Sequence, residues 1–171
     1  MYKFIAILFI FCSCTIIGLY QSAQLARRKA LLHQYRDLLQ HMETEMGYFK
    51  DPLPVILQKM HKGTNQPADL LLRQCLFQME QGSETIADIW ERAIGEAYDG
   101  EPLNASDLTI MTKCGSFLGQ SDYQGQKGHF ALLQGELNGQ IDDATANCKT
   151  KGTLYTKAGI SVGAVIAIAL L

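Results

Sequence analysis

The chain has 171 residues, 47% of them hydrophobic, and its formal net charge at pH 7 is -2. This length is sufficient for one domain with a hydrophobic core, and it leaves no room for a second large domain. The slightly acidic balance argues against nucleic acid as a partner, because a nucleic-acid-binding surface needs an excess of lysine and arginine.

The chain begins with a long uncharged apolar run. The run extends from Phe4 to Tyr20, has one serine and one threonine as its clearly polar members, and is preceded by Lys3. It exceeds the apolar part of a secretory signal peptide and no convincing cleavage site follows it, so residues 1–20 are expected to form an uncleaved membrane anchor. A cleaved signal peptide and a lipoprotein signal ending at Cys14 are the rival interpretations.

A second apolar block occupies residues 158–171. As a helix it is about 21 Å long at 1.5 Å per residue, shorter than the roughly 30 Å hydrocarbon core of a bilayer. A span that begins at Leu154 is long enough if the side chain of Lys157 extends to the headgroups. We therefore expect a C-terminal membrane anchor, with a buried core helix as the alternative.

Basic residues flank both apolar blocks on the side of the intervening chain. They are Arg27, Arg28 and Lys29 after the first block, and Lys149, Lys151 and Lys157 before the second. Because lysine and arginine mark the cytoplasmic ends of membrane spans, residues 21–157 are expected to face the cytoplasm. Outside the first anchor the cysteines form an odd set without metal-ligand spacing, which is typical of buried thiols in a reducing compartment.

Residues 21–157 show the apolar spacing of amphipathic helices and no strand pattern. The first soluble helix is expected to continue out of the membrane span, because no proline or glycine occurs between Tyr20 and Met46. Its apolar seam, at spacings of three and four, comprises Leu32, Tyr35, Leu39, Met42, Met46 and Phe49. A matching seam precedes the last span and comprises Phe130, Leu133, Leu137, Ile141, Ala144 and Cys148. Each narrow seam needs a partner helix.

Helix-start and helix-stop residues divide the chain between these two long helices. Asp51 and Pro52 are expected to open a second helix that ends at Gly63, and Asn65 and Pro67 to open a third that ends at Gly82. Ser83 is expected to open a fourth helix. Asn104 with Asp107 is expected to open a fifth that ends at Gly119, and Ser121 with Gln124 to open a sixth. Short connections favour antiparallel neighbours. We therefore expect an all-α antiparallel bundle of about six helices over residues 21–157, whose first and last helices continue into the two spans.

The sequence contains no recognisable catalytic or cofactor motif. A glycine-rich phosphate loop, a nucleotide fingerprint and a nucleophile elbow are all missing. His41 and Glu45 share a helix face, but two ligands are too few for a metal site. Glu43 and Glu45 point to different faces of their helix, which argues against their carboxyl groups acting together as general acid and general base. No catalytic residue, metal or cofactor is expected, and the chain is interpreted as a binding protein rather than an enzyme.

Two segments carry a resemblance to a known family. Residues 42–53 read METEMGYFKDPL and residues 115–126 read GSFLGQSDYQGQ, between two terminal anchors and ahead of the approach KGTLYTKAG to the last one. These features closely resemble stage III sporulation protein AB over the whole chain. The resemblance implies a membrane component of the channel complex between mother cell and forespore in endospore-forming bacteria. It also implies a fold similar to the cytoplasmic helical domain of F-type platform proteins in type II secretion and type IV pilus machines.

The family pattern falls on Glu43, Glu45, Tyr48, Pro52, Leu53, Leu118, Gly119, Asp122 and Gln126. Of this set, Pro52 and Gly119 are also expected to be helix boundaries, Leu53 and Leu118 to be core residues, and Asp122 to be a helix cap. Glu43, Glu45 and Gln126 are expected to be exposed without such a duty. The predicted partner contacts are Glu43, Glu45, Tyr48, Asp122 and Gln126.

The resemblance implies a scaffold or platform subunit needed for endospore formation. Its implied partners are a secretion-type sporulation ATPase, other stage III channel proteins of the membrane, membrane lipid and further copies of the chain. Its implied place is the mother-cell side of the outer forespore membrane. A platform protein usually carries two copies of the helical domain, whereas this chain has one. A membrane-anchored helical sensor is the alternative function.

Overall fold

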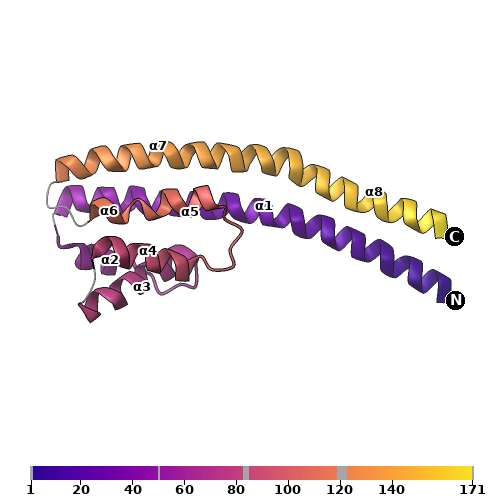
Figure 1. Ribbon diagram of the computed structural model, residues 1–171, viewed down its shortest axis with the longest axis horizontal. Coiled ribbons are helices and arrows are strands. Elements are labelled where there is room, and N and C mark those ends of the chain that lie inside the picture. Colours follow the sequence, from indigo (N-terminus) through magenta and orange to yellow (C-terminus); the bar gives the residue numbers. More distant parts are fainter. Residues whose placement is uncertain (1, 50, 83–84, 119–122, 171) are drawn as a thin grey trace. The chain divides into compact units, whose positions relative to one another are not determined.

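A computed structural model describes residues 2–49, 51–82, 85–118 and 123–170, and every regular element in these ranges is a helix (Figure 1). The elements are α1 (Tyr2–Phe49), α2 (Leu53–Met60), α3 (Pro67–Gln81), α4 (Ile86–Ala97), α5 (Ala105–Thr112), α6 (Gly115–Leu118), α7 (Tyr123–Asn147), the π-helix η1 (Cys148–Gly152) and α8 (Thr153–Leu170). The predicted all-α fold is confirmed. The chain divides into two compact units: a central unit, residues 31–141, and a terminal unit, residues 1–30 together with 142–171.

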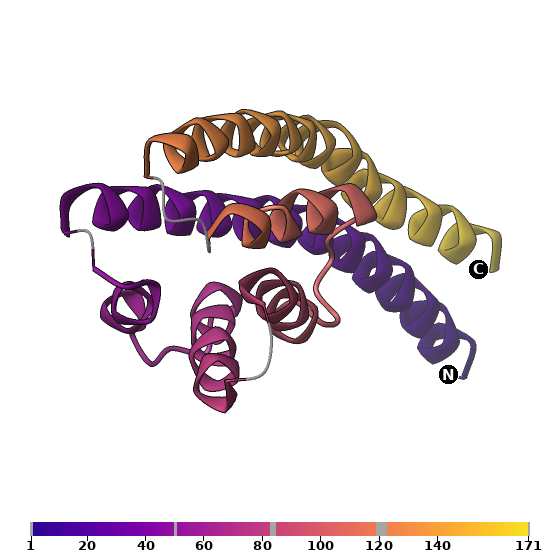
Figure 2. The ribbon, with the colours of Figure 1, turned by 60° about the vertical axis from the view of Figure 1, so that its left-hand side comes forward.

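The core of the central unit lies between the long helices and the short ones. The predicted seam of α1 is confirmed at Leu32, Tyr35, Leu39 and Met42, which are fully buried, whereas Met46 is half-buried and the side chain of Phe49 is outside the described part. Phe130, Leu133 and Leu137 of α7 are buried as expected. Within this unit α7 runs along one side of α1, while α2, α3 and α4 lie on the other side (Figures 1 and 2).

Two aromatic side chains secure the end of α5. The hydroxyl of Tyr35 and the indole N–H of Trp90 both donate to the carbonyl oxygen of Met111, at 2.7 and 3.1 Å. Met111 stands in the last turn of α5, where a carbonyl has no partner within the helix. These two bonds satisfy a buried acceptor and join α1, α4 and α5 at one point. Burial raises the pKa of Tyr35 well above its ordinary value, so the phenol remains a donor.

Some helix boundaries agree with the local signals and others do not. Asn104 and Asp107 form the predicted capping box of α5, with reciprocal bonds of 2.8 and 3.0 Å, and Gly82 ends α3 in a left-handed conformation. The expectation that Asp51 caps α2 is wrong, because its carboxylate lies 2.6 Å from the Lys59 ammonium. Thr85, which accepts from the amide of Asp88, caps α4.

Three predicted boundary residues lie outside the described residues. They are Ser83, expected to cap α4, Ser121, expected to cap α7, and Gly119, expected to end the fifth helix. The single helix expected from Asn104 to Gly119 is divided into α5 and α6. Gly115, which opens α6, lies against α4, and a Cβ on it would be 2.7 Å from the Cβ of Trp90. A two-residue turn, Lys113 and Cys114, separates the two helices.

In the terminal unit the first part of α1 and α8 are antiparallel and touch through their backbones (Figure 2). A Cβ on Gly18 would lie 2.6 Å from the carbonyl oxygen of Tyr155, and one on Gly159 would lie 2.8 Å from that of Cys14. A Cβ on Gly163 would lie 3.0 Å from the ring of Phe11. Glycine at these positions therefore permits the close approach of the two helices, as small residues do in membrane helix pairs.

The outer faces of these two helices are apolar. The exposed large hydrophobic residues are Leu8, Phe9, Ile16, Ile17 and Leu19 on α1, and Leu154, Ile160, Val162, Val165 and Ile168 on α8. Among the described residues one helix, α1, is long and apolar enough to cross a membrane, which supports the predicted N-terminal span. The C-terminal span stays a prediction, as do its boundaries and those of the first.

Candidate partner-binding site

The predicted contact residues Glu43, Glu45 and Tyr48 lie in the last turns of α1, but their side chains point to different neighbours. Glu43 is half-buried, and its Oε2 accepts a 2.8 Å bond from the amide of Gln134 on α7. Glu43 therefore takes part in packing α7 against α1. A structural duty of this kind was not expected for it.

Glu45 faces α2 instead. The Lys59 ammonium of α2 pairs with Asp51 at 2.6 Å, and the pKa of Lys59 is raised first by this hydrogen bond and to a smaller extent by the charge of Glu45. Glu45 is half-exposed, so it adds negative charge at the junction of α1 and α2. Glu43 and Glu45 thus do not form one continuous acidic patch.

Tyr48 is the most prominent side chain at this end of α1. It is 81% exposed, whereas tyrosine side chains are partly buried on average. Beside it lies a shallow depression of about 440 Å³ lined by Glu43, Thr44, Gly47 and Lys127. Tyrosine is enriched in protein–protein interfaces and among the residues that contribute most to their affinity.

The expectation that Gln126 is exposed is wrong. Its side chain is 2% exposed, and Nε2 donates a 3.0 Å bond to the carbonyl oxygen of Phe117. The bond ties the start of α7 to α6. A signal for this was present in the sequence, because Gln126 is four residues before Phe130 and so continues the apolar seam of α7. Asp122 lies outside the described residues.

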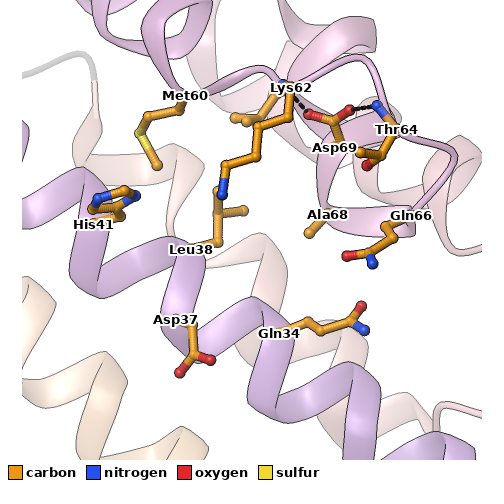
Figure 3. A pocket seen from close by; sticks show the side chains of 11 residues that line it. Gln34, Asp37, Leu38, His41, Met60, Lys62, Thr64, Gln66, Ala68 and Asp69 are labelled. Carbon is orange, nitrogen blue, oxygen red and sulfur yellow. Dashed lines mark hydrogen bonds between the residues drawn. The ribbon is translucent and has the colours of Figure 1, made fainter.

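A groove that the sequence did not indicate lies between α1 and the loop from α2 to α3 (Figure 3). Its volume is about 380 Å³. Its walls comprise Gln34, Asp37, Leu38 and His41 of α1, with Met60, Lys62, Thr64, Gln66, Ala68, Asp69 and Leu72 opposite. The side chain of Lys62 extends from the loop toward α1 (Figure 3). Polar and apolar side chains both line the groove, which is open to solvent.

Asp69 holds the loop that forms one wall of this groove. Its Oδ1 accepts from the backbone N–H of Lys62 at 2.8 Å and lies 3.0 Å from Nδ1 of His61, while Oδ2 accepts from the N–H of Thr64. Burial by itself raises the pKa of Asp69, but the two backbone donors and then His61 outweigh it and hold the pKa below its ordinary value. The ionised carboxylate therefore stabilises the loop.

Replacing this carboxylate should loosen the loop. We expect Asp69→Asn to lower the free energy of unfolding by about 2 to 3 kcal/mol at neutral pH, because an amide cannot accept from all these donors. The pKa is lower in the folded chain, so the contribution of Asp69 is present above the unfolded pKa and is lost as the pH falls through the folded one. Thermal unfolding across acidic pH measures both effects.

The matched control is Asp99→Asn, the same change at an exposed aspartate. It should leave the unfolding temperature close to that of the parent. If the two variants were equally stable at neutral pH, the carboxylate of Asp69 would not be holding the loop.

The buried polar groups of the central unit offer no activated nucleophile among the described residues. Burial raises the pKa of the Cys75 thiol to about 12, and burial raises the pKa of the Cys114 thiol further. Both thiols are therefore protonated at neutral pH, which is the inert form of cysteine. Within the ranges that the structure describes, no three His, Cys, Asp or Glu side chains gather as metal ligands.

Charge is divided unevenly between the two units. The terminal unit contains seven Lys and Arg against two Asp and Glu, so its net charge is +5, and the central unit contains eight against fifteen, so its net charge is -7. The overall value of -2 conceals this separation. An excess of this size in a unit of 111 residues favours binding to a surface of the opposite sign.

Comparisons with known proteins show the family of the chain. Stage III sporulation protein AB of Bacillus subtilis (strain 168) is 27% identical over 144 residues, which are 84% of each chain. A solved structure of stage III sporulation protein AB (SpoIIIAB) superposes with a TM-score of 0.65 at 27% identity, covering 71% of this chain and 96% of that one. The family model described as stage III sporulation protein AB (spore_III_AB) matches residues 3–171. The chain therefore belongs to the stage III sporulation protein AB family.

Proposed function

We propose that the chain is a non-enzymatic membrane scaffold of the channel complex between mother cell and forespore, and that its central unit docks a secretion-type ATPase and other membrane components. Membership of a sporulation family supports the process. The observation that carries the docking role is the division of the chain into an apolar, basic terminal unit and a folded central unit with a net charge of -7. A basic face on the partner would complement that charge.

The long first helix supplies a mechanical connection. α1 continues without a break from Tyr2 to Phe49, so its first part belongs to the terminal unit and its last part to the central unit. A load that a partner applies to the central unit is then transmitted along a hydrogen-bonded helix to the membrane. The energy for such a load comes from the partner, because the chain itself is proposed to be a non-enzymatic scaffold.

The surface around Tyr48 is the proposed docking site. It combines an exposed aromatic ring with the half-exposed carboxylate of Glu45 at the junction of α1 and α2. Tyrosine contributes a large contact area at a small entropic cost, while the charge sets the encounter rate and specificity more than the affinity. Glu43 is less suited to a test because it also holds Gln134.

The test is the double variant Tyr48→Ala with Glu45→Gln in sporulating cells. We expect fewer heat-resistant spores and weaker crosslinks to the ATPase, with unchanged amounts of the protein in the membrane. The control is Phe77→Ala with Glu80→Gln, which removes an exposed aromatic ring and an exposed acid from α3. Spore counts that are equal for the two variants would remove the Tyr48 surface from the mechanism, and a lack of any crosslink between the native chain and an ATPase would refute the docking role.

The proposed site of action is the outer forespore membrane, with the central unit in the mother-cell cytoplasm. The basic residues beside the apolar helices support this orientation. A cysteine at the exposed position Gln81, at the end of α3, should resist a membrane-impermeant thiol reagent in intact cells and react after lysis. Labelling of Gln81→Cys in intact cells would reverse the orientation and separate the central unit from any cytoplasmic ATPase.

A further inference from the structure

The terminal unit contains more basic than acidic residues. Its sequence contains only two acids, Asp142 and Asp143. Asp143 is already engaged, because its Oδ2 lies 3.1 Å from Nη1 of the buried Arg28 and its Oδ1 accepts from the amide of Asn147 at 3.0 Å. The side chains of Lys149, Lys151 and Lys157 are exposed, so their ammonium groups are accessible to a ligand.

Two exposed tyrosines mark one level of the antiparallel helix pair. A Cβ added to Gly18 would lie 2.6 Å from the carbonyl oxygen of Tyr155, and one added to Gly152 would lie 3.2 Å from the hydroxyl of Ser22, so these pairs of residues are close neighbours. Tyr20 lies between Gly18 and Ser22 on α1, so it stands level with the start of α8. Tyr20 and Tyr155 are 60% and 40% exposed. Tyrosines at one level, beside apolar helix faces, are typical of the boundary between hydrocarbon and headgroups.

The exposed lysines lie close to this level. Lys149 and Lys151 belong to η1, which directly precedes α8. They lie just beyond the level of the tyrosines, on the side opposite to the apolar helix faces. Lys157 follows Tyr155 by two residues and is also exposed. A lysine side chain can extend by several bonds along the helix, so all three ammonium groups can reach the depth of the phosphates.

We infer that Lys149, Lys151 and Lys157 bind the phosphate groups of anionic phospholipids, so that the terminal unit is selective for an anionic membrane surface. The inference rests on the proposed insertion of the apolar helices into a bilayer. The tyrosine level favours lipid as the ligand, because it brings the lysines to headgroup depth. Each lysine at an anionic surface strengthens association by about fivefold at moderate ionic strength, and the effect falls as salt is added.

The test uses the full chain in bilayers of phosphatidylcholine mixed with phosphatidylglycerol. Electron paramagnetic resonance of spin-labelled lipids measures the association constant of each lipid at the protein surface. We expect the ratio of the constants for phosphatidylglycerol and phosphatidylcholine to exceed one, and to fall toward one in the double variant Lys149→Gln with Lys151→Gln and at high salt. The control, Lys62→Gln with Arg73→Gln, removes two exposed charges from the central unit and should keep the parent ratio.

Resistance of the chain to alkaline extraction from the same bilayers distinguishes failure of the lipid inference from failure of the proposed function. A chain that is extracted is not inserted, which overturns the proposed membrane role together with this inference. A chain that resists extraction but shows a ratio of one overturns the lipid inference alone. The lipid inference is also overturned if the η1 double variant keeps the parent ratio, or if the control loses it to the same extent.

Discussion

Leu39→Asp should abolish the cooperative unfolding transition of the central unit. The Leu39 side chain has no exposure to solvent, and it stands in the α1 seam with Tyr35 and Met42. An aspartate there places a carboxylate in an apolar site without a partner and leaves part of the leucine volume empty. Such changes cost about 3 to 5 kcal/mol or more, against the roughly 5 to 15 kcal/mol that hold an ordinary domain together.

Circular dichroism of the full chain in detergent, followed with temperature, measures this loss. The matched control is Leu132→Asp on α7, where the leucine is 65% exposed and an aspartate remains hydrated. We expect the control to unfold at nearly the parent temperature. A Leu39→Asp variant with the same melting temperature as the control would mean that the α1 seam is not part of the core.

Gly18→Leu should separate the helix pair of the terminal unit. Even the first side-chain atom would lie 2.6 Å from the carbonyl oxygen of Tyr155 and 3.2 Å from the Cα of Gly159, and both are backbone atoms that no rotamer change can move. The helices must then shift apart along their whole contact. Overpacking of this kind costs typically about 1 to 3 kcal/mol, and leucine adds several carbon atoms at the point of closest approach.

A disulfide reporter can measure the separation. The hydroxyl of Ser22 lies 3.2 Å from the position of a Cβ on Gly152, so Ser22→Cys with Gly152→Cys, in a chain without its own cysteines, should form a bond on oxidation. We expect the yield to fall sharply when Gly18→Leu is added. Gly139→Leu, at a glycine with nothing within 4 Å of its Cβ position, should leave the yield unchanged. Equal yields in the two variants would show that the helices do not rely on contact at Gly18.

Helix patterns of short range could be predicted from the sequence, because their causes lie within a few residues. The spacing of Leu32, Tyr35 and Leu39 follows from the period of the helix itself, and these residues are buried as expected. Asn104 and Asp107 form a capping box because both bonds close within one turn. Gly82 ends α3 because glycine adopts a positive φ at little cost.

Boundaries and exposures that depend on distant residues could not be predicted in the same way. Asp51 could bond either the backbone of α2 or Lys59, and only the folded helix brings that ammonium within 2.6 Å. Gln126 is of a residue type that is usually exposed, but the carbonyl of Phe117 provides a buried partner for its amide. The close contact between Gly115 and Trp90, which are 25 residues apart along the chain, likewise exists only in the folded chain.

The family, the helical class and the apolar ends of this protein are encoded in local composition and order, so the sequence alone determined them. The tertiary structure decided which surfaces remain available. It turned Glu43 toward Gln134 and Glu45 toward Lys59, and it left Tyr48 exposed. It also grouped the two basic ends of the chain into one unit of charge +5, distinct from a central unit of charge -7. Such grouping arises from antiparallel packing of helices more than 100 residues apart, which no local pattern records.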